Sequence, residues 1–387
     1  MKNKINIILL GANYYGEMAS SQRVYNLFSS LVAKGQITLH NIVYRQDEVL
    51  ILDDKVHVYA PPQKHRILNR LSYPFYILKA LKQCYCKEAK NIIYHYGYPS
   101  VESVFFLKKA QRMGFKIVFD IVENIYAYST QNMSFIHRIK NISENYLVKN
   151  FAGIGNFFFG ISQPLVALCE QLTQKQVPTQ LLPISVDVNL VASYKKYIEN
   201  KDSIVVFYGG SFGQKDGFPY LIQGFTQAWK QNKRLCLYLT GKIARESIVE
   251  VQELLNQTEA ADAIHYFGCL PRDVYYTHVA NADILCMPRV NSLFANSGFP
   301  FKLGEYLASG NAVIATRTSD VEKYLTHKKD AFLIAPENAD AICDAIMELT
   351  TDQQLRISIG EAGKQIAQDN FDVNVVSKSL YDILIAL

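Results

Sequence analysis

The stretch that decides the fold is Pro288–Thr316, which reads PRVNSLFANSGFPFKLGEYLASGNAVIAT. It follows an apolar run and begins at a proline, which indicates that a strand ends there and a loop follows. Apolar residues at helical spacing then predict a helix over Phe301–Ser309, which stops at Gly310. A second apolar run, Ala312–Ala315, predicts another buried strand. A strand, a helix and a further strand in this order indicate one repeat of a parallel α/β sheet.

The same alternation runs through the rest of the chain. In the first half, the predicted strands are Ile5–Leu10, Ile37–Tyr44, Asn91–Tyr96 and Lys116–Ile121, and the predicted helices are Ser20–Lys34 and Val101–Arg112. In the second half, the predicted strands are Ile204–Tyr208, Leu235–Thr240, Ala263–Phe267, Ile284–Met287 and Ala331–Ile334, and a helix is predicted over Tyr220–Trp229. Apolar strands that alternate with helices predict parallel sheets with both faces covered.

The chain of 387 residues is long enough for two or three domains. The pattern restarts after the polar stretch Tyr194–Asp202, so we expect one domain over 1–190 and a second over 200–375. The chain has 40 Lys and Arg and 35 Asp and Glu. Residues 1–200 hold 23 of the basic and 13 of the acidic residues, so the rest of the chain holds 17 basic and 22 acidic residues. A basic first half and an acidic second half predict domains with different partners.

Composition excludes several classes of protein. Apolar residues make up 49% and charged residues 19%, which excludes wholesale disorder and fibrous repeats. The seven cysteines form no C-x-x-C pair, so no structural zinc site is expected, and free thiols suit a reducing cytoplasm. The uncharged stretch Phe151–Cys169 is interrupted by glycines and Pro164. It predicts a core strand, Asn156–Ile161, that enters a helix at Ser162, in preference to a membrane span.

One helix and two glycine-rich turns hold residues that could carry chemistry. The helix after Pro300 places Lys302 and Glu305 on one face, where the carboxylate could accept two hydroxyl groups of a sugar ring, and Lys302 and Arg289 could neutralise phosphates. A solvated Lys–Glu pair is the alternative. Two glycine-rich turns follow strands, where backbone amides can approach a phosphate. One is Gly11–Gly16, and the other is Gly209–Gly217, in which Lys215 adds a charge. Plain surface turns remain the alternative for both.

The sequence resembles the family-4-type retaining glycosyltransferases of the GT-B fold. The stretch around P-x-K-L-x-E-Y-L-A-x-G looks like their donor-binding signature. Five further segments, before and after this signature, resemble segments of the family and occur in the family's order. They are Leu182–Asp187, Gly209–Gly217, Ile264–Gly268 with Ala280–Pro288, Val321–Leu325 and Ala331–Pro336. The resemblance covers nearly the whole chain. It implies an α/β protein of two Rossmann-like parallel-sheet domains that face each other across a cleft, with a C-terminal helix, about 376–387, that crosses back to the first domain.

The resemblance also implies roles for individual residues. The second domain would bind a nucleotide-sugar, with Glu305 on the ribose and the glycine turn and Lys215 at the pyrophosphate. Lys302 and Arg289 would assist with phosphate charge, and no metal or other cofactor is expected. The full donor-binding set is Gly209, Gly210, Ser211, Gly213, Lys215, Arg289, Ser297, Gly298 and Glu305, with Lys302 also a catalytic candidate. Ser297 departs from the family, because a first glutamate normally stands at that position.

The first domain would bind the acceptor. The candidate residues on the acceptor side are Gly11, Tyr14, Tyr15 and Gly16. Asp120 lies at the end of the predicted strand Lys116–Ile121 and Glu123 follows it, where either carboxylate could orient the acceptor hydroxyl as a catalytic residue. A helix-capping aspartate is the alternative for Asp120.

Residues 55–90 form a basic stretch with eight Lys and Arg against the single acid Glu88, and Tyr73, Phe75, Tyr76 and Tyr85 lie among them. Basic residues with aromatic rings suit an anionic membrane surface and a lipid-linked acceptor. A solvated basic face is the alternative. No nucleic-acid-binding motif accompanies the charge, so no nucleic-acid partner is predicted.

The sequence therefore predicts a cytoplasmic glycosyltransferase, peripheral on the inner face of the cell membrane. It would move a sugar from a nucleotide-sugar to a glycan or lipid-linked acceptor in surface polysaccharide biosynthesis, with retention of configuration. A catalytically silent GT-B partner of an active transferase is the main alternative, because of Ser297. A sugar-nucleotide epimerase is a further alternative, although the sequence offers no clear acid/base set for it.

Overall fold

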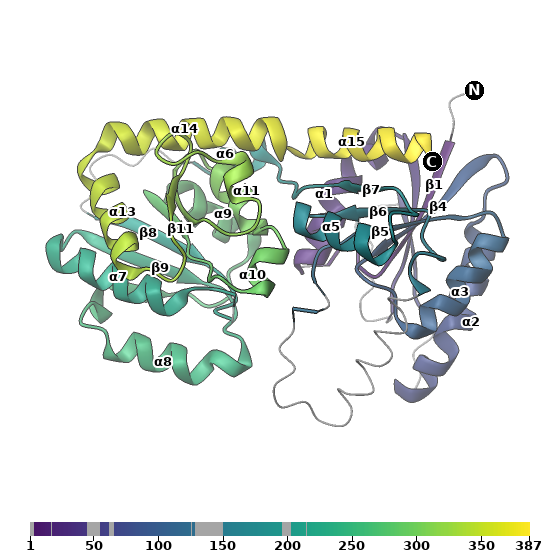
Figure 1. Ribbon diagram of the computed structural model, residues 1–387, viewed down its shortest axis with the longest axis horizontal. Helices are drawn as coiled ribbons and strands as arrows, with labels where there is room; N and C mark the ends of the chain where they lie inside the picture. The colour runs from purple at the N-terminus through teal and green to yellow at the C-terminus, as the bar shows by residue number, and fades with distance from the viewer. Residues whose placement is uncertain are drawn as a thin grey trace. The chain divides into compact units, whose positions relative to one another are not determined.

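The computed structural model describes residues 4–16, 18–44, 55–61, 66–124, 126–127, 150–195, 203–213 and 215–387. The chain divides into two compact units (Figure 1). The first unit runs to Ser185 and also includes Val373–Leu387, and the second unit is Val186–Asp372. Each unit is built around its own parallel sheet.

The described residues of the first unit form a seven-stranded sheet in the order β3-β2-β1-β4-β5-β6-β7. The strands are β1 (Lys4–Leu10), β2 (Ile37–Ile42), β3 (Val56–Tyr59), β4 (Ala89–Tyr96), β5 (Lys116–Ile121), β6 (Phe157–Gly160) and β7 (Thr179–Leu181). Every pair of neighbours is parallel. The predicted strands of this half are therefore confirmed, and the strand order reverses direction between β1 and β4.

The helices of the first unit connect these strands and cover the sheet. Among the described residues, they are α1 (Ala19–Ala33), α2 (Arg66–Cys84), α3 (Val101–Arg112), α5 (Gln163–Leu172) and α15 (Val373–Ala386). Helix α15 comes from the end of the chain and packs on α1, where Val376, Leu380 and Leu384 join the core. The hydroxyl of Ser377 on α15 donates to the Asn26 carbonyl over 3.1 Å.

The uncharged stretch Phe151–Cys169 forms strand β6 and enters helix α5, as predicted. Ser162 is the N-cap of α5, since its side chain accepts a hydrogen bond from the Leu165 amide, and Pro164 lies in the first turn. Among the described residues, no helix combines the length and the apolar composition that crossing a bilayer requires.

The second unit holds a six-stranded sheet in the order β10-β9-β8-β11-β12-β13, as far as the described residues show. The strands are β8 (Ile204–Gly209), β9 (Leu235–Thr240), β10 (Ile264–Tyr266), β11 (Ile284–Met287), β12 (Ala312–Thr316) and β13 (Phe332–Ile334). All pairs are again parallel. The strand order reverses between β8 and β11, and ligands of open parallel sheets bind outside the carboxyl ends of the strands at such a point.

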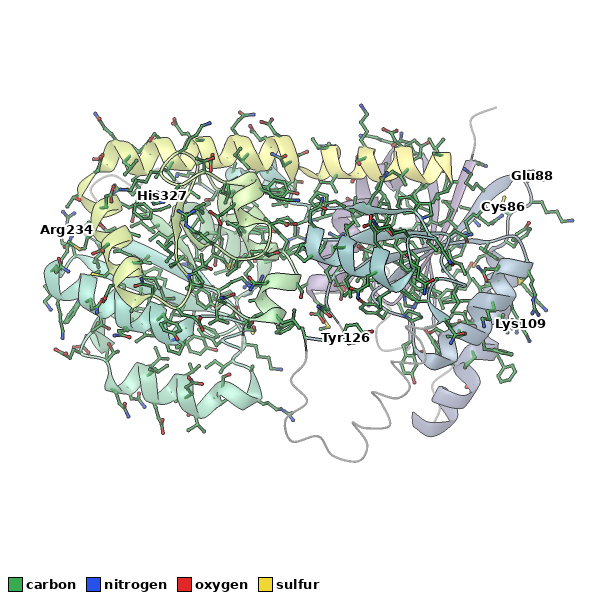
Figure 2. All side chains as sticks on the ribbon, viewed as in Figure 1. Cys86, Glu88, Lys109, Tyr126, Arg234 and His327 are labelled. Atoms are coloured by element: carbon green, nitrogen blue, oxygen red, sulfur yellow. The ribbon has the colours of Figure 1, made fainter. Side chains whose placement is uncertain are left out.

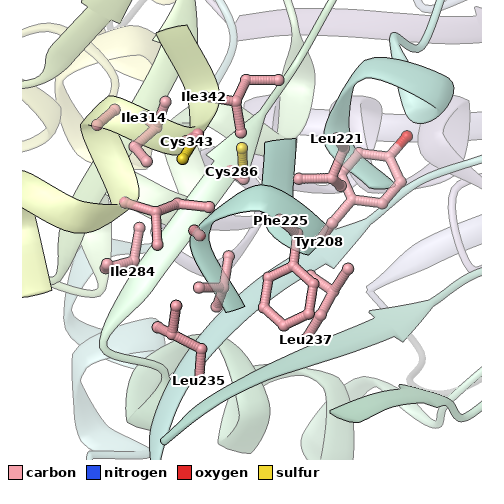
Figure 3. Close-up of a cluster of buried hydrophobic side chains, with 14 of the residues drawn as sticks. Tyr208, Leu221, Phe225, Leu235, Leu237, Ile284, Cys286, Ile314, Ile342 and Cys343 are labelled. Atoms are coloured by element: carbon pink, nitrogen blue, oxygen red, sulfur yellow. The ribbon is translucent and has the colours of Figure 1, made fainter. Parts of the chain in front are cut away.

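Helices of the second unit cover its sheet. They are α6 (Val188–Ser193), α7 (Phe218–Gln231), α8 (Ile248–Gln257), α9 (Arg272–Asn281), α10 (Leu293–Ser297), α11 (Phe301–Ala308), α12 (Val321–Tyr324), α13 (Ala339–Thr351) and α14 (Gln353–Asn370). Helices α7 and α13 pack closely, because Gly224 has no Cβ and so lets the Ala339 carbonyl approach. Figure 3 shows the core between these helices and the sheet, with Phe225, Leu237 and Ile314 fully buried.

Candidate active site

The reversal of strand order in the second unit brings two of the predicted turns together. One turn follows β8 and begins at Gly209, and the other follows β11 and begins at Pro288. Their backbones are in contact, since Asp216 forms an antiparallel bridge with Arg289 and the Gly217 amide donates to the Pro288 carbonyl. The two glycine-containing stretches that the sequence singled out therefore form one site at the carboxyl edge of this sheet.

Glycines give the first turn its close packing. A Cβ on Gly209 would lie 3.1 Å from the Tyr275 ring and 3.3 Å from the Lys302 Nζ. A Cβ on Gly241, whose φ is +123°, would lie 1.8 Å from the Gly210 carbonyl oxygen. The absence of side chains therefore lets the amine of Lys302 and the turn after β9 reach the backbone of the turn after β8.

Asp216 holds the same turn in shape. Its Oδ2 accepts hydrogen bonds from the Ser211 hydroxyl over 2.9 Å and from the Gly213 amide over 3.2 Å. The sequence did not single out Asp216. Lys215, predicted at the pyrophosphate, places its Nζ 5.0 Å from the centroid of the Phe294 ring on α10, a cation–π distance. In this structure, Lys215 therefore contacts an aromatic ring of the second turn.

Arg289 is a buried cation of the second turn and is 6% exposed. Its guanidinium donates to the Gly298 carbonyl over 3.2 Å, and its amide donates to the Thr316 hydroxyl. Burial lowers the pKa of Arg289, while the nearby Asp216 acts in the opposite direction. Ser297, at the end of α10, is also buried, and its hydroxyl donates to the Leu293 carbonyl over 2.6 Å.

Lys302 and Glu305 lie on the first two turns of α11, and they are not a solvated pair. Glu305 is 7% exposed, and burial raises the pKa of its carboxyl group against the opposing effect of Lys302. Burial likewise lowers the pKa of Lys302, against the charges of Glu305 and Asp216. Leu303, on the same helix, is fully buried. Two tyrosine hydroxyls from α9 donate hydrogen bonds to the Glu305 carboxylate.

The turn after β1 in the first unit holds the residues predicted on the acceptor side. Gly11 has φ +81°, and a Cβ there would lie 2.3 Å from the Tyr96 carbonyl oxygen at the end of β4. The side chains of Tyr14 and Tyr15 are 3% and 7% exposed and belong to the core of this unit. A Cβ on Gly16 would collide with the Ser21 hydroxyl. This turn is therefore tightly packed, with its tyrosines directed inward.

Asp120, predicted to orient the acceptor, is fully buried at the end of β5. Its two carboxylate oxygens accept from the guanidinium of Arg23 on α1 over 2.7 and 2.8 Å. The same guanidinium donates to the Leu182 and Pro183 carbonyls, each over 2.9 Å. Burial acts to lower the pKa of Arg23, but the charge of Asp120 raises it above its ordinary value.

This ion pair connects α1 to β5 and to the segment after β7. It is a structural role, different from both roles suggested for Asp120, acceptor orientation and helix capping. Glu123, the second acidic candidate, lies two residues beyond β5 and is exposed. Of the two predicted carboxylates, only that of Glu123 reaches the surface.

Several residues that hold predicted site residues in place were not themselves predicted from the sequence. Tyr275 and Tyr276 lie about thirty residues before Glu305, and Arg23 lies 97 residues before Asp120. Tyr306 accepts a hydrogen bond from the Gly209 amide over a separation of 97 residues. No local pattern in the sequence links such residues, since the sheet order alone brings them together. For Asp216, the one available signal was its place inside a glycine-rich turn.

The whole fold is similar to solved glycosyltransferase structures. Alr3699/HepE of Anabaena, in complex with UDP, matches with a TM-score of 0.74 and 14% identity over 99% of this chain and 100% of that one. Sucrose-phosphate synthase of Thermosynechococcus elongatus matches with a TM-score of 0.73 and 15% identity over 99% of both chains. The protein therefore has the GT-B fold, with two Rossmann-like parallel-sheet domains.

The sequence of the second unit is similar to that of a known family. Residues 192–366, which lie in the second unit, match the model of the glycosyl transferases group 1 family. A GDP-mannose-dependent α-(1-6)-phosphatidylinositol monomannoside mannosyltransferase of Mycobacterium tuberculosis is 24% identical over 136 residues, 35% of each chain. Trehalose phosphorylase of Grifola frondosa is 30% identical over 112 residues, 29% of this chain and 15% of that protein. The matches span about a third or less of these curated relatives.

Proposed function

We propose that the protein is a retaining glycosyltransferase that moves a sugar from a nucleotide-sugar to an acceptor hydroxyl. The observation that carries the proposal is the cluster at the carboxyl edge of the second sheet. There the glycine turn after β8, two buried or half-buried cations and a buried carboxylate come together within a glycosyl transferases group 1 domain. These groups have the chemistry that a nucleoside diphosphate requires.

Each group has a task in this proposal. The Glu305 carboxylate accepts the ribose hydroxyls of the donor, and the backbone of Gly209 and Gly210 approaches the diphosphate. Lys302 and Arg289 supply positive charge as the bond between the sugar and the diphosphate breaks and negative charge develops on the leaving oxygen. Both cations are largely removed from water, and electrostatic attraction is stronger in such a setting than at a solvated surface.

The acceptor would bind to the first unit, beside the turn Gly11–Gly16, and Glu123 would orient its hydroxyl. The mycobacterial relative is named for GDP-mannose and for a phosphatidylinositol-linked acceptor, and Alr3699/HepE was solved with UDP. These names support UDP- and GDP-sugars as donors and a lipid-linked acceptor, and we place the reaction in surface polysaccharide biosynthesis as part of the same proposal. Such an acceptor and the basic face of the first unit support a place in the cytoplasm, at the inner face of the cell membrane.

A panel of UDP- and GDP-sugars tests the donor. We expect one of them to raise the melting temperature, since a ligand at 100 times its dissociation constant stabilises by about 2.7 kcal/mol. The same donor should be hydrolysed slowly, with release of the nucleoside diphosphate. Stabilisation without any release, with or without acceptor extracts, would favour the silent partner of an active transferase, a candidate motivated by Ser297. No stabilisation by any donor would contradict the proposed function.

We also propose that the basic face of the first unit binds an anionic membrane surface. Lys79, Lys82 and Lys87 on and after α2 are exposed. Phe75 of α2 is 67% exposed, and its ring centroid lies 6.2 Å from that of Phe105 on the neighbouring helix α3. The Nζ of Lys109, labelled on α3 in Figure 2, lies 4.2 Å from the Phe105 ring centroid. Exposed rings among lysines suit the interface of an anionic bilayer.

Replacing Lys79, Lys82 and Lys87 together by glutamate should weaken binding to anionic vesicles. Each basic residue near such a surface contributes about 1 kcal/mol, screened by salt, and the change reverses three charges. Co-sedimentation with phosphatidylserine vesicles at several salt concentrations measures this. A matched triple variant, Lys323→Glu, Lys329→Glu and Lys378→Glu, changes the net charge equally at exposed positions elsewhere. Equal binding of the two triple variants would mean that residues 55–90 are a solvated face.

A further inference from the structure

Two neighbouring tyrosines of α9 hold the two oxygens of the Glu305 carboxylate. The Tyr275 hydroxyl donates to Oε2 over 2.9 Å, and the Tyr276 hydroxyl donates to Oε1 over 3.2 Å. Tyr276 is 4% exposed, and Tyr275 is half-buried. A carboxylate oxygen has two lone pairs, so each oxygen keeps one acceptor position after it has accepted a tyrosine hydroxyl. The carboxylate is thereby oriented and still able to accept two further hydroxyl groups.

Tyr275 also contacts the groups proposed for the diphosphate. Its ring lies against the Cα of Gly209, since a Cβ there would be 3.1 Å from the ring. The Lys302 Nζ lies 5.2 Å from the ring centroid, within cation–π range. Tyr275 therefore lies between the glycine turn, the lysine and the carboxylate, and contacts all three.

The charges around Glu305 come from two helices. Lys302 and Tyr306 belong to α11, while Tyr275, Tyr276 and Arg272 belong to α9. Burial raises the pKa of Glu305, and Lys302, the two tyrosine hydroxyls and Arg272 all lower it. The hydrogen bonds of the tyrosines therefore favour the ionised form, which is the form that accepts hydroxyl groups on both oxygens.

We propose that Tyr275 and Tyr276 are positioning residues of the donor site, which hold the Glu305 carboxylate in the orientation that accepts the ribose hydroxyls. The inference rests on the proposed function and adds to it a pair of residues that act through Glu305. Removal of either hydroxyl leaves the ring in place. It lets the Glu305 carboxylate group rotate more freely and removes one hydrogen bond that stabilises its ionised form.

Titration of UDP and of GDP into the Tyr275→Phe and Tyr276→Phe variants tests this. We expect binding of whichever nucleotide the parent binds to weaken about 5- to 20-fold for Tyr275→Phe. The loss for Tyr276→Phe should be about 2- to 10-fold, because its hydrogen bond is longer. Binding requires ionised Glu305, so the decline of affinity on acidification should begin at higher pH in both variants. Tyr238→Phe, on β9 in the same unit, is the matched control and should bind like the parent.

A double-mutant cycle separates positioning from general packing. In a Glu305→Gln background, both tyrosine substitutions should change nucleotide affinity by less than about twofold, because the charge on which they act is gone. A ligand-free measurement completes the test. In protein labelled with ¹³C at the glutamate carboxyl groups, the Glu305 signal is the one missing from Glu305→Gln. Its titration midpoint should rise in both tyrosine variants.

The outcomes distinguish this inference from the proposed function. A parent that binds UDP or GDP, with phenylalanine variants that bind equally well and titrate with an unchanged midpoint, overturns the inference alone. Equal losses in the parental and Glu305→Gln backgrounds also overturn it, since the tyrosines would then act through packing. A parent that binds neither nucleotide nor any nucleotide-sugar overturns the donor site and the inference together, even where the Glu305 midpoint moves.

Discussion

Replacing Glu305 by alanine is expected to weaken donor binding or transfer by tens to thousands of fold. An ionised carboxylate that accepts two ribose hydroxyls makes charge-assisted hydrogen bonds worth about 1.5–3 kcal/mol each. Because the contributions of neighbouring hydrogen bonds are not fully additive, we expect a loss of about 2–5 kcal/mol, which corresponds to that range of affinities. Glu305→Gln keeps the shape and one acceptor oxygen, so its loss should fall between the parent and the alanine variant. Calorimetric titration with UDP, GDP and their sugars measures the effect.

The structure adds an expectation about stability that the sequence did not contain. From the sequence, a Glu305 carboxylate that faces a cleft would support little of the core, so its removal would leave the fold intact. In the structure it accepts from Tyr275 and Tyr276, so alanine leaves one half-buried and one buried hydroxyl group without their acceptor. Each such group costs about 1–3 kcal/mol. We therefore expect Glu305→Ala to melt earlier than Glu305→Gln.

An exposed glutamate of the same unit, Glu361 on α14, provides the control. Glu361→Ala should leave both melting and nucleotide affinity at the parental values. If Glu305→Ala melts like the parent and binds the nucleotide equally well, the donor-site assignment is wrong, and the family match then supports only the fold.

Asp120→Asn is expected to destabilise the first unit by about 3–5 kcal/mol, because it leaves the Arg23 guanidinium buried without its counter-charge. In a unit of this size, such a loss lowers the melting temperature by about 6–20 °C. The asparagine keeps the shape of the side chain, so the effect reports the charge and its hydrogen bonds. Calorimetric melting or denaturant titration of the purified variant measures it.

The matched control is Asp382→Asn, the same substitution at an exposed position on α15 of the same unit. It should change stability by no more than about 0.5 kcal/mol. One outcome for Asp120→Asn itself would restore the hypothesis that Asp120 is catalytic. If Asp120→Asn melts like the parent and yet abolishes transfer, the carboxylate acts on the acceptor and the ion pair with Arg23 contributes little.

Much of the fold could be predicted because its signals are local. The apolar runs at 116–121, 235–240 and 284–287 became β5, β9 and β11 with the predicted bounds, and the helix at 101–112 became α3. Ser162 marked the entry into α5, since its hydroxyl caps the helix N-terminus. The helix predicted at 20–34 lies one residue earlier in the structure, since α1 runs from Ala19 to Ala33. Its N-cap residue, Met18, makes no side-chain capping hydrogen bond that would mark the start of the helix.

The candidate site was predictable only in part. The glycine turn and the helix with Lys302 and Glu305 stood out in the sequence, because glycine spacing and a lysine and a glutamate on one helical face are visible in a short stretch. The environment of each side chain was not visible. Asp120 looked like a surface carboxylate at the end of a strand, but α1 places Arg23 against it.

The sequence by itself determined which residues form strands, helices and glycine turns, and it contains the match of residues 192–366 to the glycosyl transferases group 1 family. These properties depend on hydrophobic spacing, turn chemistry and short motifs, all of which act between near neighbours in the chain. Only the tertiary structure decided which charges are paired and buried. Partners such as Glu305 with Tyr275, or Asp120 with Arg23, meet because the strand order reverses and brings distant segments to one sheet edge. The burial that shifts their pKa values and fixes their orientation exists only once both sheets are covered by their helices.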